Sequence, residues 1–235
     1  MLTRIALLLV FFLAACPRLL ALHVAQVNAP ALSGYELAAM TLAEDFISPE
    51  EIAAARPGVS YSRQQLKAFK DTLPVCEELA WLRDNGFMLV AGPPRPLSLL
   101  DIRKLNPQYF FPKSGGWYLN ERERFSRNEK VITKWLKLRK GPLPGSTSKS
   151  WEEQIALLAD VEYVPNDAEL EWGVTTYKAV RGVYLLSKVY VRTASRDNVV
   201  NGHIYVGYFA EDGLYISGYW DSSRNVPVGI ASARK

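Results

Sequence analysis

Residues 164–235 place one predicted helix before several short β-rich runs, and this order constrains the fold more than any other feature of the sequence. Val164-Pro165-Asn166-Asp167 begins a helix that runs to about Val180 and ends at Arg181-Gly182. β-branched and aromatic residues then dominate four runs, at residues 183–192, 203–209, 214–220 and 229–233. A helix followed by short strands predicts an α+β fold with a small, twisted antiparallel sheet.

Residues 48–115 are predicted to form a mainly helical N-terminal region. Ser48-Pro49-Glu50-Glu51 is a strong helix start, because serine caps, proline suits the first turn and glutamates favour the positive helix end. Further helices are predicted at residues 62–73, 77–84 and 98–105. A buried strand is predicted at residues 87–91.

Two more elements belong to residues 116–235, the predicted C-terminal domain. Residues 134–139 alternate polar and apolar side chains, which is typical of a half-buried strand. Residues 148–159 place Trp151, Ile155 and Leu158 at helical spacing, which predicts an amphipathic helix. The domain therefore has two predicted helices besides its sheet, and residues 22–47 are predicted to link the leader to the helical region.

Residues 1–21 have the pattern of an export leader. A basic start precedes an apolar run at residues 5–15 that is too short to span a membrane comfortably. Leu13-Ala14-Ala15-Cys16 resembles the lipobox of bacterial lipoproteins, in which the cysteine is lipidated. Cys16 is thus the candidate lipidation site, and this anchor is the only membrane contact that we predict.

Two alternatives to lipidation remain open. Pro17 and the apolar residues after it depart from the lipoprotein pattern, and simple cleavage after Ala21 would also remove the leader. Met40 could instead be the true start of translation. We expect a protein of the cell envelope or a secreted one if the leader is used, and a cytoplasmic one if translation starts at Met40.

Cysteine and histidine are scarce, which limits the chemistry of the chain. Cys16, Cys76, His23 and His203 are the only such residues, and no CxxC or HExxH spacing occurs. We therefore predict no metal site and no cofactor. The formal net charge is +4, and the densest basic run, residues 130–140, follows several glutamates. A nucleic-acid partner would need a clustered basic face, so none is predicted.

The order of the C-terminal pieces matches a known pattern. The helix led by Val-Pro-Asn-Asp-Ala-Glu-Leu, the strand 190–195, the hairpin 204–216 and the closing run 228–234 follow one another. This order resembles C-type-lectin folds of the formylglycine-generating-enzyme type. That family carries a Leu-Pro-x-x-x-Glu helix, a Trp/Val-x-Ser/Thr-Ser strand, an aromatic-x-Val-x-Phe-x-x-Gly hairpin and a Val-Arg-x-Val-Arg strand. The resemblance implies a C-type-lectin-like domain at residues 116–235.

Within that group, residues 198–227 resemble the tails of target proteins of diversity-generating retroelements in bacteria, which carry variable residues on the ligand-facing surface. The resemblance implies a set of ligand-binding residues at Asn201, His203, Tyr205, Tyr208, Tyr215, Ser217, Tyr219, Ser222, Asn225 and Pro227. Between them stand apparent scaffold residues, namely Val206, Gly207, Phe209, Gly213, Leu214, Trp220 and Gly229. It also implies a protein or glycan as partner.

The residue types themselves favour a recognition surface. Tyrosine offers a large contact area at low entropic cost, and serine, glycine and asparagine offer adaptable hydrogen bonds. In the predicted strand 214–220, Tyr215, Ser217 and Tyr219 share one face. The alternative is that these tyrosines cover a sheet edge or pack in the core. Packing is the role we predict for five of the tryptophans, Trp117, Trp135, Trp151, Trp172 and Trp220.

Enzymatic function is disfavoured by what the chain lacks. The cysteine pair of formylglycine-generating enzymes cannot exist, since no cysteine follows Cys76. Glu169 and Glu171 are predicted to lie on a helix surface, where this spacing does not form a dyad. His203 has no evident neighbour to orient it, and Trp220-Asp221 is only a fragment of a calcium-site motif. A non-enzymatic receptor is the favoured function, with a structural envelope lipoprotein or a hydrolase or transferase as alternatives.

Overall fold

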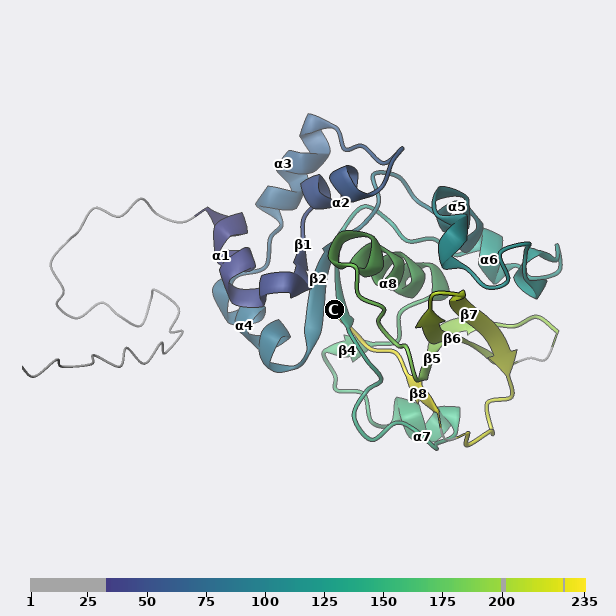
Figure 1. Ribbon diagram of the computed structural model, residues 1–235. Coiled ribbons are helices and arrows are strands. Elements are labelled where there is room, and N and C mark those ends of the chain that lie inside the picture. Colours follow the sequence, from purple (N-terminus) through teal and green to yellow (C-terminus); the bar gives the residue numbers. More distant parts are fainter. Residues whose placement is uncertain (1–32, 200–201, 226) are drawn as a thin grey trace, which may run out of the picture. The chain divides into compact units, whose positions relative to one another are not determined.

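A computed structural model describes residues 33–199, 202–225 and 227–235 (Figure 1). The candidate leader and Cys16 lie outside these residues. Residues 33–235 form one compact unit. The fold is mixed, with eight α-helices and two small sheets in the described part of the chain. Among the helices described, none combines the length and the apolar character that a membrane span needs.

Three of the six N-terminal helices begin at serine residues that the sequence predicts as caps. The six described helices are α1 (Gly34–Leu42), α2 (Pro49–Ala55), α3 (Arg63–Asp71), α4 (Cys76–Asp84), α5 (Leu99–Leu105) and α6 (Phe125–Asn128). Ser48, Ser62 and Ser98 each close a capping box with the acidic or amide side chain three residues later. The predicted helix starts at these serines are therefore confirmed.

The first sheet has five strands in the order β1-β2-β3-β9-β4. They are β1 (Phe46–Ile47), β2 (Phe87–Ala91), β3 (Trp135–Arg139), β9 (Ala233–Arg234) and β4 (Glu162–Tyr163). β1 and β2 pair in parallel, and the other pairs are antiparallel. The predicted strands at residues 87–91 and 134–139 are confirmed. This sheet joins strands from both sides of the boundary predicted between residues 115 and 116.

The second sheet has four strands in the order β7-β6-β5-β8. They are β5 (Tyr190–Arg196), β6 (His203–Ala210), β7 (Gly213–Tyr219) and β8 (Val228–Ile230). The antiparallel hairpin β6–β7 is confirmed, but β8 lies parallel to β5. The expectation of a wholly antiparallel sheet is thus wrong. The segment after β7 carries the chain back along the sheet, so that β8 enters beside β5 in the same direction.

The long helix α8 (Asp167–Arg181) joins the two sheets. It contacts β3 of the first sheet and β5 and β6 of the second, and Figure 1 shows it at the centre of the fold. Its Trp172 is fully buried and donates its indole N–H to the Ala91 carbonyl at 2.9 Å. Asn166 caps the helix, and Gly182 ends it in the left-handed conformation, as the sequence predicts.

The helix predicted at residues 148–159 is shorter and faces differently. α7 covers only Trp151–Ile155. Gln154 is fully buried, whereas Ile155 is exposed, so the predicted apolar face is wrong. The reason is polar: the Gln154 amide donates to the carbonyls of Ser146 and Val228 and accepts from a buried arginine, Arg192.

Candidate functional site

The strand register of the second sheet separates an aliphatic face from an aromatic one. Val191, Val206 and Ile216 stand opposite one another and are buried. Directly opposed residues project to the same side, and neighbours along a strand project to opposite sides. The chain neighbours of these three residues therefore project to the other face of the sheet. That face carries Tyr190, Arg192, Tyr205, Tyr215 and Ser217. We call it the aromatic face.

A pocket of about 310 Å³ opens on the aromatic face. One wall comes from the strands and the other from the segment between η3 (Pro107–Tyr109) and η4 (Trp117–Leu119). The lining residues are Phe111, Pro112, Gly115, Gly116, Trp117, Tyr190, Tyr205, Tyr215, Ile216 and Ser217. Three of the residues predicted for ligand binding, Tyr205, Tyr215 and Ser217, thus meet in one pocket.

The wall formed by residues 110–117 is fixed to β7, the edge strand of this sheet. The Phe111 amide donates to the Leu214 carbonyl at 3.1 Å, and the Trp117 indole N–H donates to the Ile216 carbonyl at 2.9 Å. The Phe111 ring stacks on Tyr215 with 4.1 Å between ring centroids. These contacts also satisfy edge carbonyls that would otherwise invite another chain to pair.

Gly213 allows this close approach. Its φ is +122°, and a Cβ atom there would lie 2.7 Å from the carbonyl carbon of Phe110 and from the amide nitrogen of Phe111. Only glycine combines that conformation with that contact. The scaffold role predicted for Gly213 therefore has a physical basis, namely the docking of the pocket wall onto the hairpin turn.

Arg103 on α5 holds the same wall from behind. It is buried, and its guanidinium donates to the Lys113 carbonyl at 2.8 Å, to the Pro112 carbonyl at 3.2 Å and to the Tyr118 hydroxyl. The planar guanidinium bonds the Tyr118 hydroxyl through one terminal nitrogen and the two carbonyls through the other, a fixed spacing that a compact ammonium group does not offer.

We expect Arg103→Lys to destabilise the protein by about 2 kcal/mol, since a compact ammonium group cannot occupy both nitrogen positions from which the guanidinium serves the wall and Tyr118. Chemical denaturation at neutral pH measures this change. Lys104→Arg, on the exposed side of the same helix, is the control, and it should change stability by less than about 0.5 kcal/mol. An equal effect of the two substitutions would contradict the role of Arg103 in holding the wall.

The hydroxyl groups of Tyr190 and Tyr215 are protonated at physiological pH. Burial raises the pKa of Tyr190 to about 12, and the hydrogen bond to Asp212 at 2.7 Å raises the pKa of Tyr215. Tyr190, Tyr205 and Ser217 make no hydrogen bond through their hydroxyls to any other described residue. They are therefore free to donate to and accept from a ligand or water.

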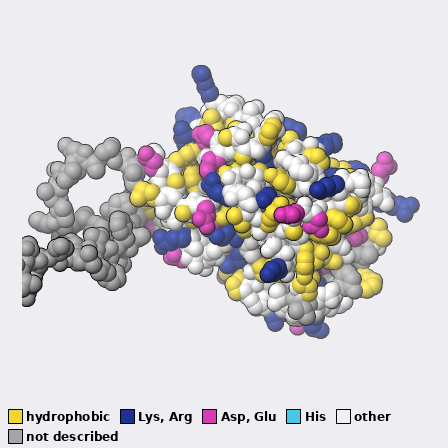
Figure 2. Space-filling view, in the orientation of Figure 1, with side chains coloured by type: hydrophobic (Ala, Val, Ile, Leu, Met, Phe, Trp, Pro, Cys, Tyr) yellow, Lys and Arg dark blue, Asp and Glu magenta, His cyan; other side chains and the backbone are white. Residues whose placement is uncertain are grey.

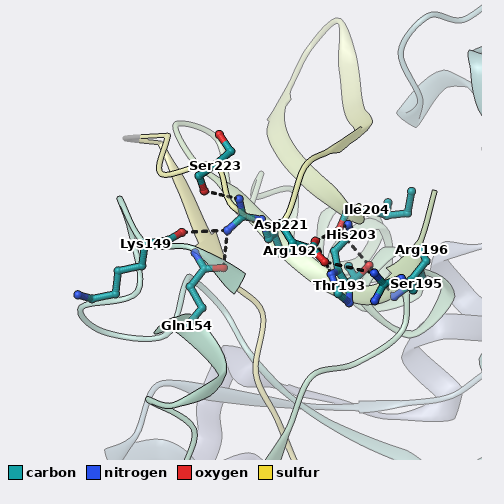
Figure 3. A network of polar contacts seen from close by, with 10 residues as sticks. All are labelled: Lys149, Gln154, Arg192, Thr193, Ser195, Arg196, His203, Ile204, Asp221 and Ser223. Atoms are coloured by element: carbon teal, nitrogen blue, oxygen red, sulfur yellow. Dashed lines mark hydrogen bonds and ion pairs between the residues drawn. The ribbon is translucent and has the colours of Figure 1, made fainter. Parts of the chain in front are cut away.

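His203 lies on the same sheet but is buried, with 4% of its surface exposed. Its Nδ1 lies 2.7 Å from Asp221 Oδ1 (Figure 3). Its ring stacks on Trp151 with 3.4 Å between ring centroids. Burial lowers the pKa of the imidazole, so the ring is neutral at pH 7. The expectation that nothing orients His203 is wrong. An aspartate 18 residues later in the chain does so.

Arg192, on β5, is buried beneath α7 and the segment that follows β7. Its guanidinium donates to the Lys149 carbonyl at 3.0 Å, to Gln154 Oε1 at 2.8 Å and to the Ser223 carbonyl at 2.7 Å (Figure 3). Together with the Trp151–His203 stack, these bonds fasten α7 and residues 221–223 over one end of the aromatic face. The pocket occupies the other end, where Tyr190 and Tyr215 lie.

The remaining predicted binding residues divide by exposure. Tyr208 is exposed, with a positive φ of 45° at a bulge, and packs beside Tyr190 at 4.6 Å. Ser222 and Asn225 are exposed and Pro227 is half-buried, on the segment after β7. Asn201 and the side chain of Tyr219 lie outside the described residues. The structure therefore gathers only part of the predicted set at the pocket.

The tryptophans that were predicted to pack in the core differ in their exposure. Trp135 and Trp172 are buried, as predicted. Trp220 is 59% exposed, so its assignment to the core is wrong. It follows the last residue of β7, at the point where the chain leaves the sheet. Trp117, assigned to packing, is 38% exposed and lines the pocket, a role that the sequence alone did not reveal.

The prediction that the carboxylates of the long helix lie on its surface is wrong. Asp167 and Glu171 are one turn apart in α8 and almost fully buried, and Glu169 is buried beside Lys134 at 2.7 Å. Burial is the main cause that raises the pKa of both Asp167 and Glu171, and their mutual proximity adds to it for Glu171. The i,i+4 spacing of two acids among apolar residues was the signal available in the sequence.

Charged side chains elsewhere on the surface are paired or mixed. Lys134, Lys137, Arg139 and Lys140, the basic run of the sequence, all form ion pairs with carboxylates. Figure 2 shows Lys and Arg interspersed with Asp and Glu over the visible face. In the described part of the chain, no cluster of His, Cys, Asp and Glu could hold a metal ion.

Comparison with known proteins gives no relative. No protein-family model, no curated protein and no solved structure matches the chain.

Proposed function

We propose that the protein is a non-enzymatic ligand-binding protein whose recognition surface is the aromatic face of the four-stranded sheet. One observation carries this proposal. Tyr205, Tyr215 and Ser217, from a tail composed like a recognition surface, line one pocket together with the aromatic residues of a separate wall. Tyrosine and serine at such a place supply contact area and adaptable hydrogen bonds to a ligand.

We further propose that the C-terminal domain is C-type-lectin-like and akin to the variable target proteins of diversity-generating retroelements. The element order supports this: α8, β5, the hairpin β6–β7 and the closing strands follow the order that the sequence resemblance implies. The scaffold positions support it as well, since Val206, Phe209 and Leu214 are buried while Tyr208, Ser222 and Asn225 between and after them are exposed.

Binding is favoured over hydrolysis by the state of the one histidine in the described residues. His203 is neutral, buried under Trp151 and hydrogen-bonded to Asp221, and among the described residues no Ser, Thr or Cys side chain hydrogen-bonds to its ring. The pair His203–Asp221 therefore serves to hold α7 on the sheet, through the stack of His203 on Trp151.

The test is a binding survey of the full chain against arrays of glycans and of peptides, repeated with Tyr205→Ala/Tyr215→Ala. We expect at least one array to give a signal that the double variant reduces at least about tenfold, because the wall formed by the sheet loses two of its aromatic rings. Arg63→Ala with Gln64→Ala is the control, at two exposed positions of α3 that do not line the pocket.

The melting temperature of each variant separates binding from folding. The two tyrosines are only half-buried, so the double variant should remain folded at the temperature of the assay. If neither array gives a signal, or if the signal survives in a folded double variant, the aromatic face is not the recognition surface.

A further inference from the structure

We propose that the pocket on the aromatic face binds one uncharged sugar ring of a glycan, held by stacking and hydroxyl groups without a bound metal ion. This inference rests on the proposed function, since it names the ligand class of the same site. It commits to a glycan where the proposed function leaves a protein partner open.

The aromatic walls suit the apolar side of a sugar ring. Trp117 and Phe111 belong to one wall, and Tyr190, Tyr205 and Tyr215 belong to the sheet. The C–H groups on one side of a pyranose form a flat apolar surface, and burying such a surface against aromatic rings is favourable. A pocket of about 310 Å³ has room for a single ring with part of its neighbour.

The hydroxyl groups suit the polar rim of the same ligand. Tyr190, Tyr205 and Ser217 come from three adjacent strands, and their hydroxyls have no partner among the described residues. A hydroxyl both donates and accepts, which matches the hydroxyls of a sugar. The Trp117 N–H already bonds the Ile216 carbonyl, so it is not free to bind the carbonyls of a proline-rich peptide.

The charges of the pocket select against ionised ligands. No Lys, Arg, Asp or Glu side chain lines it. The Asp212 carboxylate accepts a hydrogen bond from the hydroxyl of Tyr215, which lines the pocket, and would repel an anionic sugar. An ion buried here would lose its hydration without gaining a partner, which costs more than placing a neutral ring.

The experiment titrates the full chain with methyl glycosides of glucose, galactose, mannose and N-acetylglucosamine. Saturation-transfer NMR detects the bound sugar, and tryptophan fluorescence follows the titration, since Trp117 lines the pocket. At least one neutral glycoside should bind in the millimolar range. The methyl glycoside of glucuronic acid should bind at least about tenfold more weakly than its glucose counterpart. Addition of EDTA should leave the affinity unchanged.

Two tyrosine variants locate the site. Tyr205→Phe keeps the ring and removes the hydroxyl, so it should lower the affinity about three- to tenfold. Tyr184→Phe is the matched control, because Tyr184 packs against Phe209 outside the pocket, and its affinity should equal that of the wild type.

The results that would overturn the sugar inference differ from those that would overturn the proposed function. If no neutral glycoside binds at tens of millimolar, if glucuronate binds as well as glucose, or if Tyr205→Phe binds like the wild type, the sugar inference is overturned. Peptide binding that is lost in Tyr205→Ala/Tyr215→Ala would then keep the proposed function and replace the ligand class. Loss of sugar binding on EDTA treatment would overturn the proposal that the sugar is held without a metal ion.

Discussion

Gly207→Ala is expected to destabilise the protein by about 3 kcal/mol or more, because the added methyl group cannot fit. Gly207 stands between Tyr190 and Tyr215 in the register of the sheet. A Cβ atom there would lie 2.0 Å from the Val189 carbonyl oxygen and 2.7 Å from the Tyr190 Cα. Both obstacles are backbone atoms, so relief requires β5 and β6 to move apart.

Chemical denaturation gives the free energy of unfolding, and Gly141→Ala is the matched control. A Cβ atom at Gly141 meets nothing within 4 Å, so this variant should lie within about 0.5 kcal/mol of the wild type. If Gly207→Ala were as stable as Gly141→Ala, the tight contact between β5 and β6 would be refuted. Since Tyr190 and Tyr215 line the pocket, this strand pairing is also what sets their spacing.

Glu171→Gln is expected to stabilise the protein at high pH, with a gain that grows as the pH rises. Asp167 and Glu171 are buried together, and burial raises the pKa of each well above its usual value. In the unfolded chain a glutamate ionises near pH 4.3. The folded protein therefore holds protons that the unfolded chain releases, and stability that is complete below about pH 4 is lost as the pH rises.

The neutral amide of the variant removes this loss because it does not ionise, and its N–H groups are hydrogen-bond donors at every pH. At pH 8 we expect the free energy of unfolding of the variant to exceed that of the wild type, because burial raises the pKa of Glu171 in the folded protein. At pH 4 the two proteins should differ little. Urea denaturation from pH 4 to pH 9 provides both curves.

Glu121→Gln is the control for that experiment, because Glu121 is exposed in a turn. Its stability curve should run parallel to that of the wild type. Parallel curves for Glu171→Gln as well would show that the buried pair is not protonated in the folded protein. A wild-type stability that rises from pH 5 to pH 9 would contradict the sign of the argument.

Local signals in the sequence predicted the elements of the fold well. Serine followed three residues later by an acid or amide begins a helix because the cap satisfies free backbone amides, and this holds at Ser48, Ser62 and Ser98. Alternation along residues 214–219 also predicted that Tyr215 and Ser217 share a face, since a strand repeats every two residues. These rules need only neighbours in the chain.

These local rules could not predict which distant residues contact His203 or complete the pocket. His203 is oriented by Asp221 and covered by Trp151, and the pocket wall at Phe111 and Trp117 comes from a segment about a hundred residues before the sheet it completes. Each pairing depends on how distant segments pack, which no periodicity encodes. The same is true of Gln154, which is buried in α7 where the sequence predicted Ile155 to be buried. Its amide forms hydrogen bonds with buried polar groups of distant segments, which would otherwise lack a partner.

The sequence by itself therefore determined the helix starts at Ser48, Ser62 and Ser98, the β6–β7 hairpin and the shared face of Tyr215 and Ser217, because capping, turn chemistry and side-chain alternation are properties of neighbouring residues. Only the tertiary structure decided the parallel entry of β8, the burial of Asp167 and Glu171, and the pocket between Trp117 and Tyr205. Burial and enclosure arise where separate segments exclude water together, so they belong to the packed chain and not to any one stretch of it.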